Sequence, residues 1–313
     1  MLAILLALGA AISFGGSDYV AGRAARRAGT VMSVAVTAEV TKAVLVMSVV
    51  PFVSSQTPSA SSLVWGAVAG VCGGAGEMAL YLGFRHAAFS LASSVSAVGA
   101  AAFPVLAGFL FGERPGAFSL AGIALTLPAI VAVSASRGKS SADNGSGSDA
   151  ATSAHSEIDA RDPTVHHKPE IMGRNAAAVV WGLAAGAGFG LSLIGLNRAG
   201  SRTDLWPLAI AELAAVATIA CTAAAIGELK LPPTGTRRLS ALTGVMGSLG
   251  IFSYFLATHR GLLAVTAVIY SLYPAATILL ARALSGERLT GVRVIGLCLA
   301  AVSVGLIAVG ASS

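Results

Sequence analysis

The chain of 313 residues is 55% hydrophobic, carries only 11% charged residues and has a mean hydropathy of +0.80. Soluble domains have about 25% charged residues, so this composition excludes an ordinary soluble protein. The net charge of +6 does not indicate nucleic-acid binding, because the basic residues lie in short loops beside apolar runs, where they set membrane orientation. A β-barrel is excluded because its strands would alternate apolar and polar residues.

Apolar segments near the ~20 residues needed to cross a bilayer recur along the chain. In the first half they predict helices at 2–20, 31–53, 63–84, 90–111 and 118–134. A tract rich in Ser, Asp, Gly and His follows, and its composition cannot bury a core, which predicts a disordered linker. In the second half helices are predicted at 176–196, 205–226, 241–258, 262–284 and 291–310.

The two halves share short motifs in the same order, which indicates an internal duplication. The matching pairs are Phe14-Gly15-Gly16-Ser17 with Phe189-Gly190-Leu191-Ser192, Glu39 with Glu212, Arg85-His86 with His259-Arg260, and the turn Gly112-Glu113-Arg114 with Gly286-Glu287-Arg288. Because each half has five predicted spans, the second half enters the membrane from the opposite side. We therefore expect an all-α polytopic membrane protein with ten transmembrane helices in two inverted five-helix repeats, 1–136 and 176–313, joined by the linker 137–175.

The distribution of basic residues predicts the orientation. Loops after the odd-numbered spans, together with the linker, hold most of the Lys and Arg. The positive-inside rule places these loops in the cytoplasm and both termini outside.

With these motifs in place, the chain resembles the drug/metabolite transporter superfamily, specifically ten-span transporters built from two EamA repeats. The segments that carry the resemblance are 14–21, 271–277 and 286–289, with Gly291 and Gly296. Three features depart from the family pattern: Pro104 lies one helical turn closer to its Gly-Glu-Arg turn than Pro274 does, the linker is long, and family members commonly have cytoplasmic termini. The resemblance implies a carrier of a small organic metabolite or drug.

Glu39 and Glu212 are the main candidates for binding a substrate or a proton. Each lies about eight residues into its span, or ~12 Å from the end at 1.5 Å per residue. This depth places both near the middle of a hydrocarbon core ~30 Å thick. A carboxylate at that depth is costly and marks a functional pathway by default. The alternative is that Lys42, one turn away, neutralises Glu39, and that Glu212 is protonated or bonded to a neighbouring helix.

Asp18 and Glu77 are further acidic candidates. Asp18 ends the first span beside two glycines, where it faces either a substrate or the membrane interface near Arg23. Glu77 follows a glycine-rich stretch of the third span and has no acidic counterpart in the second half. Phe14, Phe189 and Tyr270 are candidates for an aromatic wall around an organic substrate, or else ordinary packing residues.

Pro104 and Pro274 interrupt the fourth and ninth spans, where they predict either a hinge for alternating access or a passive kink. The residues of the repeated turn, Gly112-Glu113-Arg114 and Gly286-Glu287-Arg288, are expected to be structural, because they lie at span ends and can cap a helix terminus. Glycines spaced by four in the third and sixth spans indicate tight helix packing. The three cysteines are expected to be small buried residues without disulfides.

These observations favour a secondary transporter in the cell membrane, moving a small molecule by alternating access, with efflux as the expected direction and a proton or exchange as the driving force. We find no phosphate-binding loop that would indicate ATP, and we expect no cofactor and no metal. A membrane-embedded enzyme, a structural or accessory membrane protein and a channel are the alternatives. No predicted span contains an internal histidine, which weighs against an enzyme.

Overall fold

The computed structural model describes residues 1–28, 31–54, 59–86, 89–135, 168–199, 204–286 and 289–310. Within these ranges every regular element is a helix. Ten of the described helices, counting one broken helix once, are long and apolar enough to cross a bilayer. The expectation of an all-α polytopic membrane protein is confirmed.

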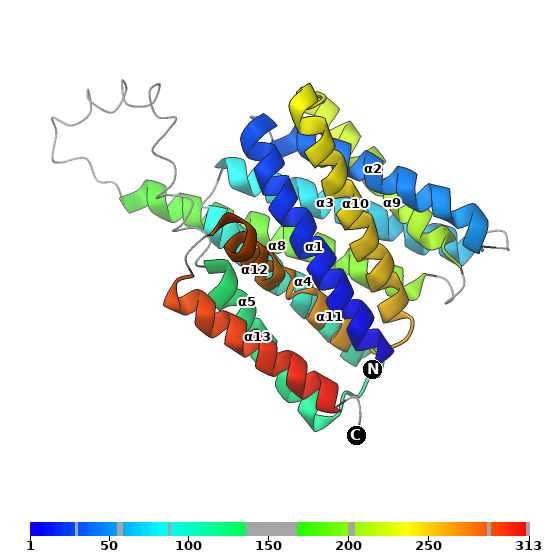
Figure 1. Ribbon diagram of the computed structural model, residues 1–313, viewed down its shortest axis with the longest axis vertical. Helices are drawn as coiled ribbons and strands as arrows, with labels where there is room; N and C mark the ends of the chain where they lie inside the picture. Colours follow the sequence, from blue (N-terminus) through cyan, green and yellow to red (C-terminus); the bar gives the residue numbers. More distant parts are fainter. Residues whose placement is uncertain are drawn as a thin grey trace.

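The helices follow the predicted order (Figure 1). The first half contains α1 (Leu2–Ala28), α2 (Val31–Val53), α3 (Ala60–His86), α4 (Phe89–Leu110) and α5 (Ala117–Ala135). The second half contains α8 (Lys168–Arg198), α9 (Trp206–Ala225), α10 (Thr234–Thr258), α11 (Leu263–Tyr270), α12 (Tyr273–Ser285) and α13 (Gly291–Gly310).

Three helices extend well beyond their predicted apolar spans. Helix α1 continues to Ala28, α8 begins at Lys168, inside the predicted linker, and α10 begins at Thr234. Apolarity alone locates the part of a helix that lies in hydrocarbon, whereas the hydrogen-bonded helix can continue through the interface on polar residues. The membrane spans were therefore predicted more accurately than the helix ends.

The ninth span is broken at its centre. Helix α11 ends at Tyr270 and α12 begins at Tyr273, with Ser271 and Leu272 buried between them. Pro274 has no backbone N–H and so cannot donate to the carbonyl of Tyr270, four residues earlier. In contrast, α4 runs continuously through Pro104. The ninth span is therefore broken before Pro274, whereas α4 continues through Pro104, and a kink or hinge at either proline stays a prediction.

The broken span is also the most enclosed one. Protein buries 72% of its apolar window, against 28–44% for the other spans. Backbone groups freed inside a bilayer have no water to bond, so a helix break must lie within protein or against a cavity. The backbone amides of Ser271 and Leu272 donate hydrogen bonds to the carbonyls of Ala267 and Ile269, so the amides at the break have partners within the same segment.

Packing between the two halves is reciprocal. Helix α1 packs along α10 of the other half, and its counterpart α8 packs along α3. Likewise α2 contacts α10 while its counterpart α9 contacts α3, and the last helices of the halves, α5 and α13, pack on each other. Figure 1 shows α5 and α13 together at one edge and α1 beside α10. This exchange of partners supports a duplicated architecture.

Glycine spacing predicted these close contacts correctly. The glycines of α3, Gly66, Gly70 and Gly74, face α9, and those of α8, Gly182, Gly186 and Gly190, face α4. A Cβ atom at Gly66 would lie 2.6 Å from the carbonyl oxygen of Pro207, and one at Gly182 would lie 2.8 Å from that of Ala92. Small residues thus allow the backbones to approach where bulkier side chains would separate them.

The cysteines differ from expectation in part. All three are free, as predicted. Cys221 and Cys298, however, are exposed and not buried. Both lie within transmembrane helices, whose outer surface faces hydrocarbon, so a small apolar side chain carries no penalty there. Apolar character therefore does not distinguish core from surface in this chain.

Candidate functional site

A cavity of about 140 Å³ lies between helices of both halves. Its walls come from α1, α2 and α3 of the first half and from α8, α9, α10 and the end of α11 of the second. Among the predicted binding candidates, Glu39, Glu212, Glu77, Tyr270, Phe14 and Phe189 line it, and Asp18 does not. Residues far apart in the sequence thus meet in one place, although their roles stay predictions.

The two central carboxylates are held by equivalent backbone contacts. In α10, Gly244 packs against the carbonyl oxygen of Ala38, the residue before Glu39. In α3, Gly70 packs in the same way against the carbonyl oxygen of Ala211, the residue before Glu212. A Cβ atom at either glycine would collide with the carbonyl oxygen. Only glycine therefore allows α10 to pack this closely against α2, and α3 against α9. Each carboxylate is thereby fixed beside a helix of the opposite half.

Glu39 and Glu212 are deeply buried, with 8% and 4% of their surface exposed. The Oε2 atoms of both side chains are buried and accept no hydrogen bond of good geometry among the described residues, although Glu77 lies within reach of the Glu39 carboxylate and Lys42 Nζ lies 3.3 Å from Glu212 Oε2. Buried acceptors are normally satisfied, so two unsatisfied carboxylate oxygens in one cavity call for an explanation. The cavity is therefore equipped to accept hydrogen bonds from a donor or to take up protons.

Lys42 connects the two carboxylates. Its Nζ atom lies 2.7 Å from Oε1 of Glu39 and 3.3 Å from Oε2 of Glu212. The first contact follows from the spacing of one helical turn within α2, and the sequence predicted it. The second crosses from α2 to α9 and was missed. A usable signal did exist, because Lys42 is the only lysine inside any predicted span.

Glu77 adds a third carboxylate to the cavity. It lies within electrostatic reach of Glu39 and Lys42. If all four side chains were ionised, the three carboxylates and one ammonium group would leave a net charge of −2 in the cavity. Such a charge is costly in a membrane interior unless protons or another cation compensate it. The cavity is therefore suited to taking up protons or another cation.

Aromatic rings form a second wall. Phe14 of α1 meets Tyr270 edge to face, with ring centroids 5.0 Å apart. Tyr254 and Tyr273 pack against Tyr270 at 5.1 and 5.9 Å. Tyr270 ends α11, so the helix break lies directly at this wall. The ring faces offer apolar contact to an organic group and electrostatic attraction to a cation.

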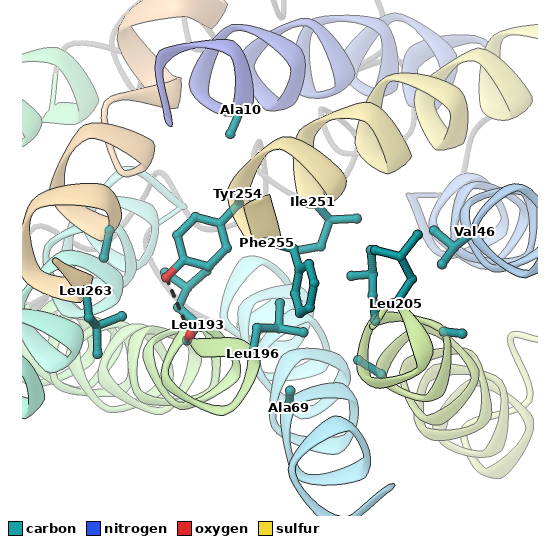
Figure 2. Close-up of a cluster of buried hydrophobic side chains, with 14 of the residues drawn as sticks. Ala10, Val46, Ala69, Leu193, Leu196, Leu205, Ile251, Tyr254, Phe255 and Leu263 are labelled. Carbon is teal, nitrogen blue, oxygen red and sulfur yellow. Dashed lines mark hydrogen bonds between the residues drawn. The ribbon is translucent and has the colours of Figure 1, made fainter. Parts of the chain in front are cut away.

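An apolar cluster closes the cavity toward the end of the bundle where α1 begins and α13 ends, here called the termini end. Its members include Leu193, Leu205, Leu208, Ile251, Tyr254, Phe255 and Leu263. On each contributing helix these residues lie level with the cavity residues or nearer the termini end. Figure 2 shows the cluster, in which the Tyr254 hydroxyl donates to the carbonyl of Leu193 at 3.4 Å. Tyr254 and Phe255 are fully buried within this cluster, which we call the seal.

The repeated turn has a structural position outside the cavity. In the first copy, the Glu113 carboxylate accepts hydrogen bonds from the backbone amides of Leu263 and Ala264, at 2.6 and 2.9 Å. It therefore caps the N-terminus of α11 in the opposite half, and not a helix of its own turn. Gly112 and Gly286 both have positive φ, +84° and +68°, which favours glycine. Glu287 and Arg288 lie outside the described residues.

Comparison with known proteins agrees with this architecture. Residues 176–309 match the EamA-like transporter family. The resemblance first seen in the sequence is thus confirmed over the second half. A search among curated proteins gives no significant match. Thirteen chains of solved structures match significantly. One of them, described as "Crystal structure of protein", has a TM-score of 0.70 and 17% identity, covering 98% of this chain and 96% of its own.

The structural match shows the fold, and the family match relates the second half of the chain to EamA-like transporters. The chain is a multi-pass membrane protein whose second half, residues 176–309, is similar to the EamA-like transporter family.

Proposed function

We propose that this protein is a secondary transporter of the cytoplasmic membrane that moves a small organic solute through the cavity between its two halves. The observation that carries this proposal is the meeting of Glu39 and Glu212 in one buried cavity. These residues occupy equivalent positions in the two halves, and equivalent half-sites around a central cavity are the arrangement that alternating access requires.

The seal supports the same proposal. An apolar cluster lies between the cavity and the termini end, and the helix break after Tyr270 lies at the cavity wall. Broken helices at the middle of the membrane are typical of substrate sites in secondary transporters. Rocking one half against the other would open this end and close the opposite one.

The charge of the cavity suggests how transport is driven. Three carboxylates facing one ammonium group form a site at which protons and a cationic solute compete for the same oxygens. Loading a proton from one side and a solute from the other then couples the two movements. With the basic loops in the cytoplasm, this coupling would drive efflux.

Reconstitution tests the proposal. Cells with and without the protein are first compared for sensitivity to metabolites and drugs, and a labelled solute found in this way is used in proteoliposomes. Trans-stimulated exchange of that solute is expected of a carrier, whereas rapid conductance without exchange indicates a channel. Conversion of a solute would indicate an enzyme, and no movement of any solute would support an accessory role.

The double variant Glu39→Gln/Glu212→Gln tests the carboxylates. We expect exchange to fall by at least about a hundredfold, in line with the cost of losing essential acid–base groups. The matched control is Glu228→Gln, which removes a carboxylate outside the cavity but keeps an oxygen that can accept the hydrogen bond from the Tyr81 hydroxyl. Unchanged exchange in the double variant would show that these carboxylates do not couple transport.

A further inference from the structure

Lys42 places a cation of the protein itself inside the candidate site. Its ammonium group lies between carboxylates of opposite halves, 2.7 Å from Glu39 Oε1 and 3.3 Å from Glu212 Oε2. The lysine stem runs along α10, where a Cβ atom on Gly247 would lie 3.5 Å from Lys42 Cδ. The glycine therefore leaves room for the stem, and the ammonium group is held within the cavity.

The two contacts of Lys42 are unequal. The contact with Glu39 is a hydrogen bond within one turn of α2, whereas the contact with Glu212 is longer and leaves Glu212 Oε2 without a hydrogen bond. Charge-assisted hydrogen bonds of N–H to carboxylate are typically ~2.7–2.9 Å long. Lys42 therefore compensates the charge of Glu212 through a longer ionic contact and not through a short hydrogen bond. A ligand that donates a shorter hydrogen bond to Glu212 can replace Lys42 at this carboxylate.

The halves are equivalent in their carboxylates but not in this cation. Counting from the matched pair Glu39 and Glu212, the position equivalent to Lys42 is Ala215, which also lines the cavity. The second half therefore presents its carboxylate with no cation of its own. Lys42 is the single ammonium group among the residues that line the cavity, and it serves both halves.

The remaining space defines what could take its place. A cavity of ~150 Å³ holds a molecule of the size of benzene, and this one is about 140 Å³. Its walls offer Phe14 and Tyr270 on one side and unsatisfied carboxylate oxygens on the other. A small primary ammonium ion that carries one ring-sized apolar group matches both surfaces.

We propose that Lys42 is an internal competitor in a site for small organic ammonium ions, and that the ligand's ammonium group replaces Lys42 Nζ at Glu212. This inference rests on the cavity of the proposed function and names its ligand class. Lys42 then keeps its bond to Glu39 while the ligand bonds to Glu212. Because every ammonium ligand must displace Lys42 from Glu212, Lys42 lowers the affinity of the site and favours release of the ligand.

Calorimetric titration of the full chain in detergent micelles tests this with benzylammonium, using uncharged benzyl alcohol as the comparison ligand. Lys42→Met removes the competing charge while keeping an unbranched stem. We expect benzylammonium to bind at least about tenfold more tightly to this variant, equivalent to ~1.4 kcal/mol, with no matching gain for benzyl alcohol. Lys42→Arg should bind as weakly as the unchanged protein.

Two further variants guard against misfolding and test the geometry. Lys42→Met/Glu39→Gln removes one charge of each sign, so it preserves the net charge of the cavity and should show the same tighter binding. Lys42→Ala/Ala215→Lys moves the ammonium group to the equivalent position of the second half, one turn from Glu212, and should restore weak binding. Thermal unfolding and gel filtration confirm that each variant is folded.

Weaker or unchanged binding of benzylammonium in both Lys42→Met and Lys42→Met/Glu39→Gln would overturn the inference. An equal gain in affinity for benzyl alcohol would also overturn it, because it would show that the substitution adds space and does not act through charge. Because the titration measures binding only, it separates the two proposals. Tighter binding without exchange of any solute would disprove transport alone. Exchange of a solute without the affinity gain would disprove the role of Lys42 alone.

Discussion

Glu113 and Leu263 are joined across 150 positions of sequence, with the Glu113 carboxylate accepting the Leu263 amide at 2.6 Å. Leu263 is the first residue of α11, so the turn of one half caps the broken span of the other. The free amides at a helix N-terminus carry partial positive charge, which a carboxylate both neutralises and bonds. The repeated turn therefore fixes the helix whose other end forms the aromatic wall of the cavity.

Removing this cap should destabilise the protein. Glu113→Ala leaves the amides of Leu263 and Ala264 without their acceptor, and losing an N-terminal cap costs about 0.5–2 kcal/mol. We expect a lower midpoint of thermal unfolding in detergent. The control is Arg114→Ala at the exposed neighbouring position, which should leave the midpoint unchanged. Equal midpoints for both variants would show that the cap contributes nothing to stability.

A second prediction concerns the close approach of α3 to α9. Gly70→Ala places a methyl group against the carbonyl of Ala211 and must push the helices apart. We expect destabilisation of about 1–3 kcal/mol, as is typical when extra volume enters a packed core. It should also weaken solute exchange, because Glu212 follows directly after Ala211.

Gly305→Ala provides the matched control for this substitution. Gly305 lies within α13, and a Cβ atom there would meet nothing within 4 Å. Alanine favours helix over glycine by about 1 kcal/mol, so this variant should be as stable as the unchanged protein or more so. If Gly70→Ala behaved like Gly305→Ala in thermal unfolding, the contact would not be a tight one.

Features of the fold that are local or periodic can be predicted from the sequence. The length of an apolar run predicts a membrane span, and the equivalent depths of two carboxylates in matched spans single out Glu39 and Glu212. The contact of Lys42 with Glu39 also follows from helical spacing alone. The contact of Lys42 with Glu212 does not, because it depends on how α2 and α9 pack, which no local pattern encodes.

The same limit applies to Glu113 and to the broken span. The position of Glu113 predicted a cap, but the helix that it caps begins in the other half of the chain. Pro274 predicted an interruption correctly, whereas Pro104 did not break α4. A proline removes one hydrogen bond in either case, and the surrounding packing decides whether the helix continues.

The aromatic wall yields a third prediction, about substrate affinity. Tyr270→Ala removes the ring that Phe14, Tyr254 and Tyr273 contact, and we expect the KM of exchange to rise about tenfold, because a lost aromatic contact costs about 0.5–1.5 kcal/mol beyond its buried area. Tyr270→Phe keeps the ring and should leave KM nearly unchanged. A large effect of Tyr270→Phe would instead assign the role to the hydroxyl group.

The final prediction concerns the seal at the termini end and compares two equivalent positions. Asp18 of α1 and Leu193 of α8 follow Ser17 and Ser192 in the matched motifs, so they lie toward opposite ends of the membrane. Leu193 is 3% exposed within the apolar cluster, whereas Asp18 is half-buried and polar. The polar residue suits a wet path, and the apolar one suits a closed gate.

Cysteine accessibility tests this difference. In a background with Cys72, Cys221 and Cys298 replaced by alanine, we introduce Asp18→Cys or Leu193→Cys and treat membrane vesicles with an impermeant thiol reagent. Asp18→Cys should react readily from the side opposite the termini. Leu193→Cys should react at least about tenfold more slowly from the side of the termini, which corresponds to an opening cost of ~1.4 kcal/mol or more, because from that side the reagent reaches it only when the seal opens. Rapid labelling of Leu193→Cys from the side of the termini would show that the cavity is open there and that the cluster does not act as a gate.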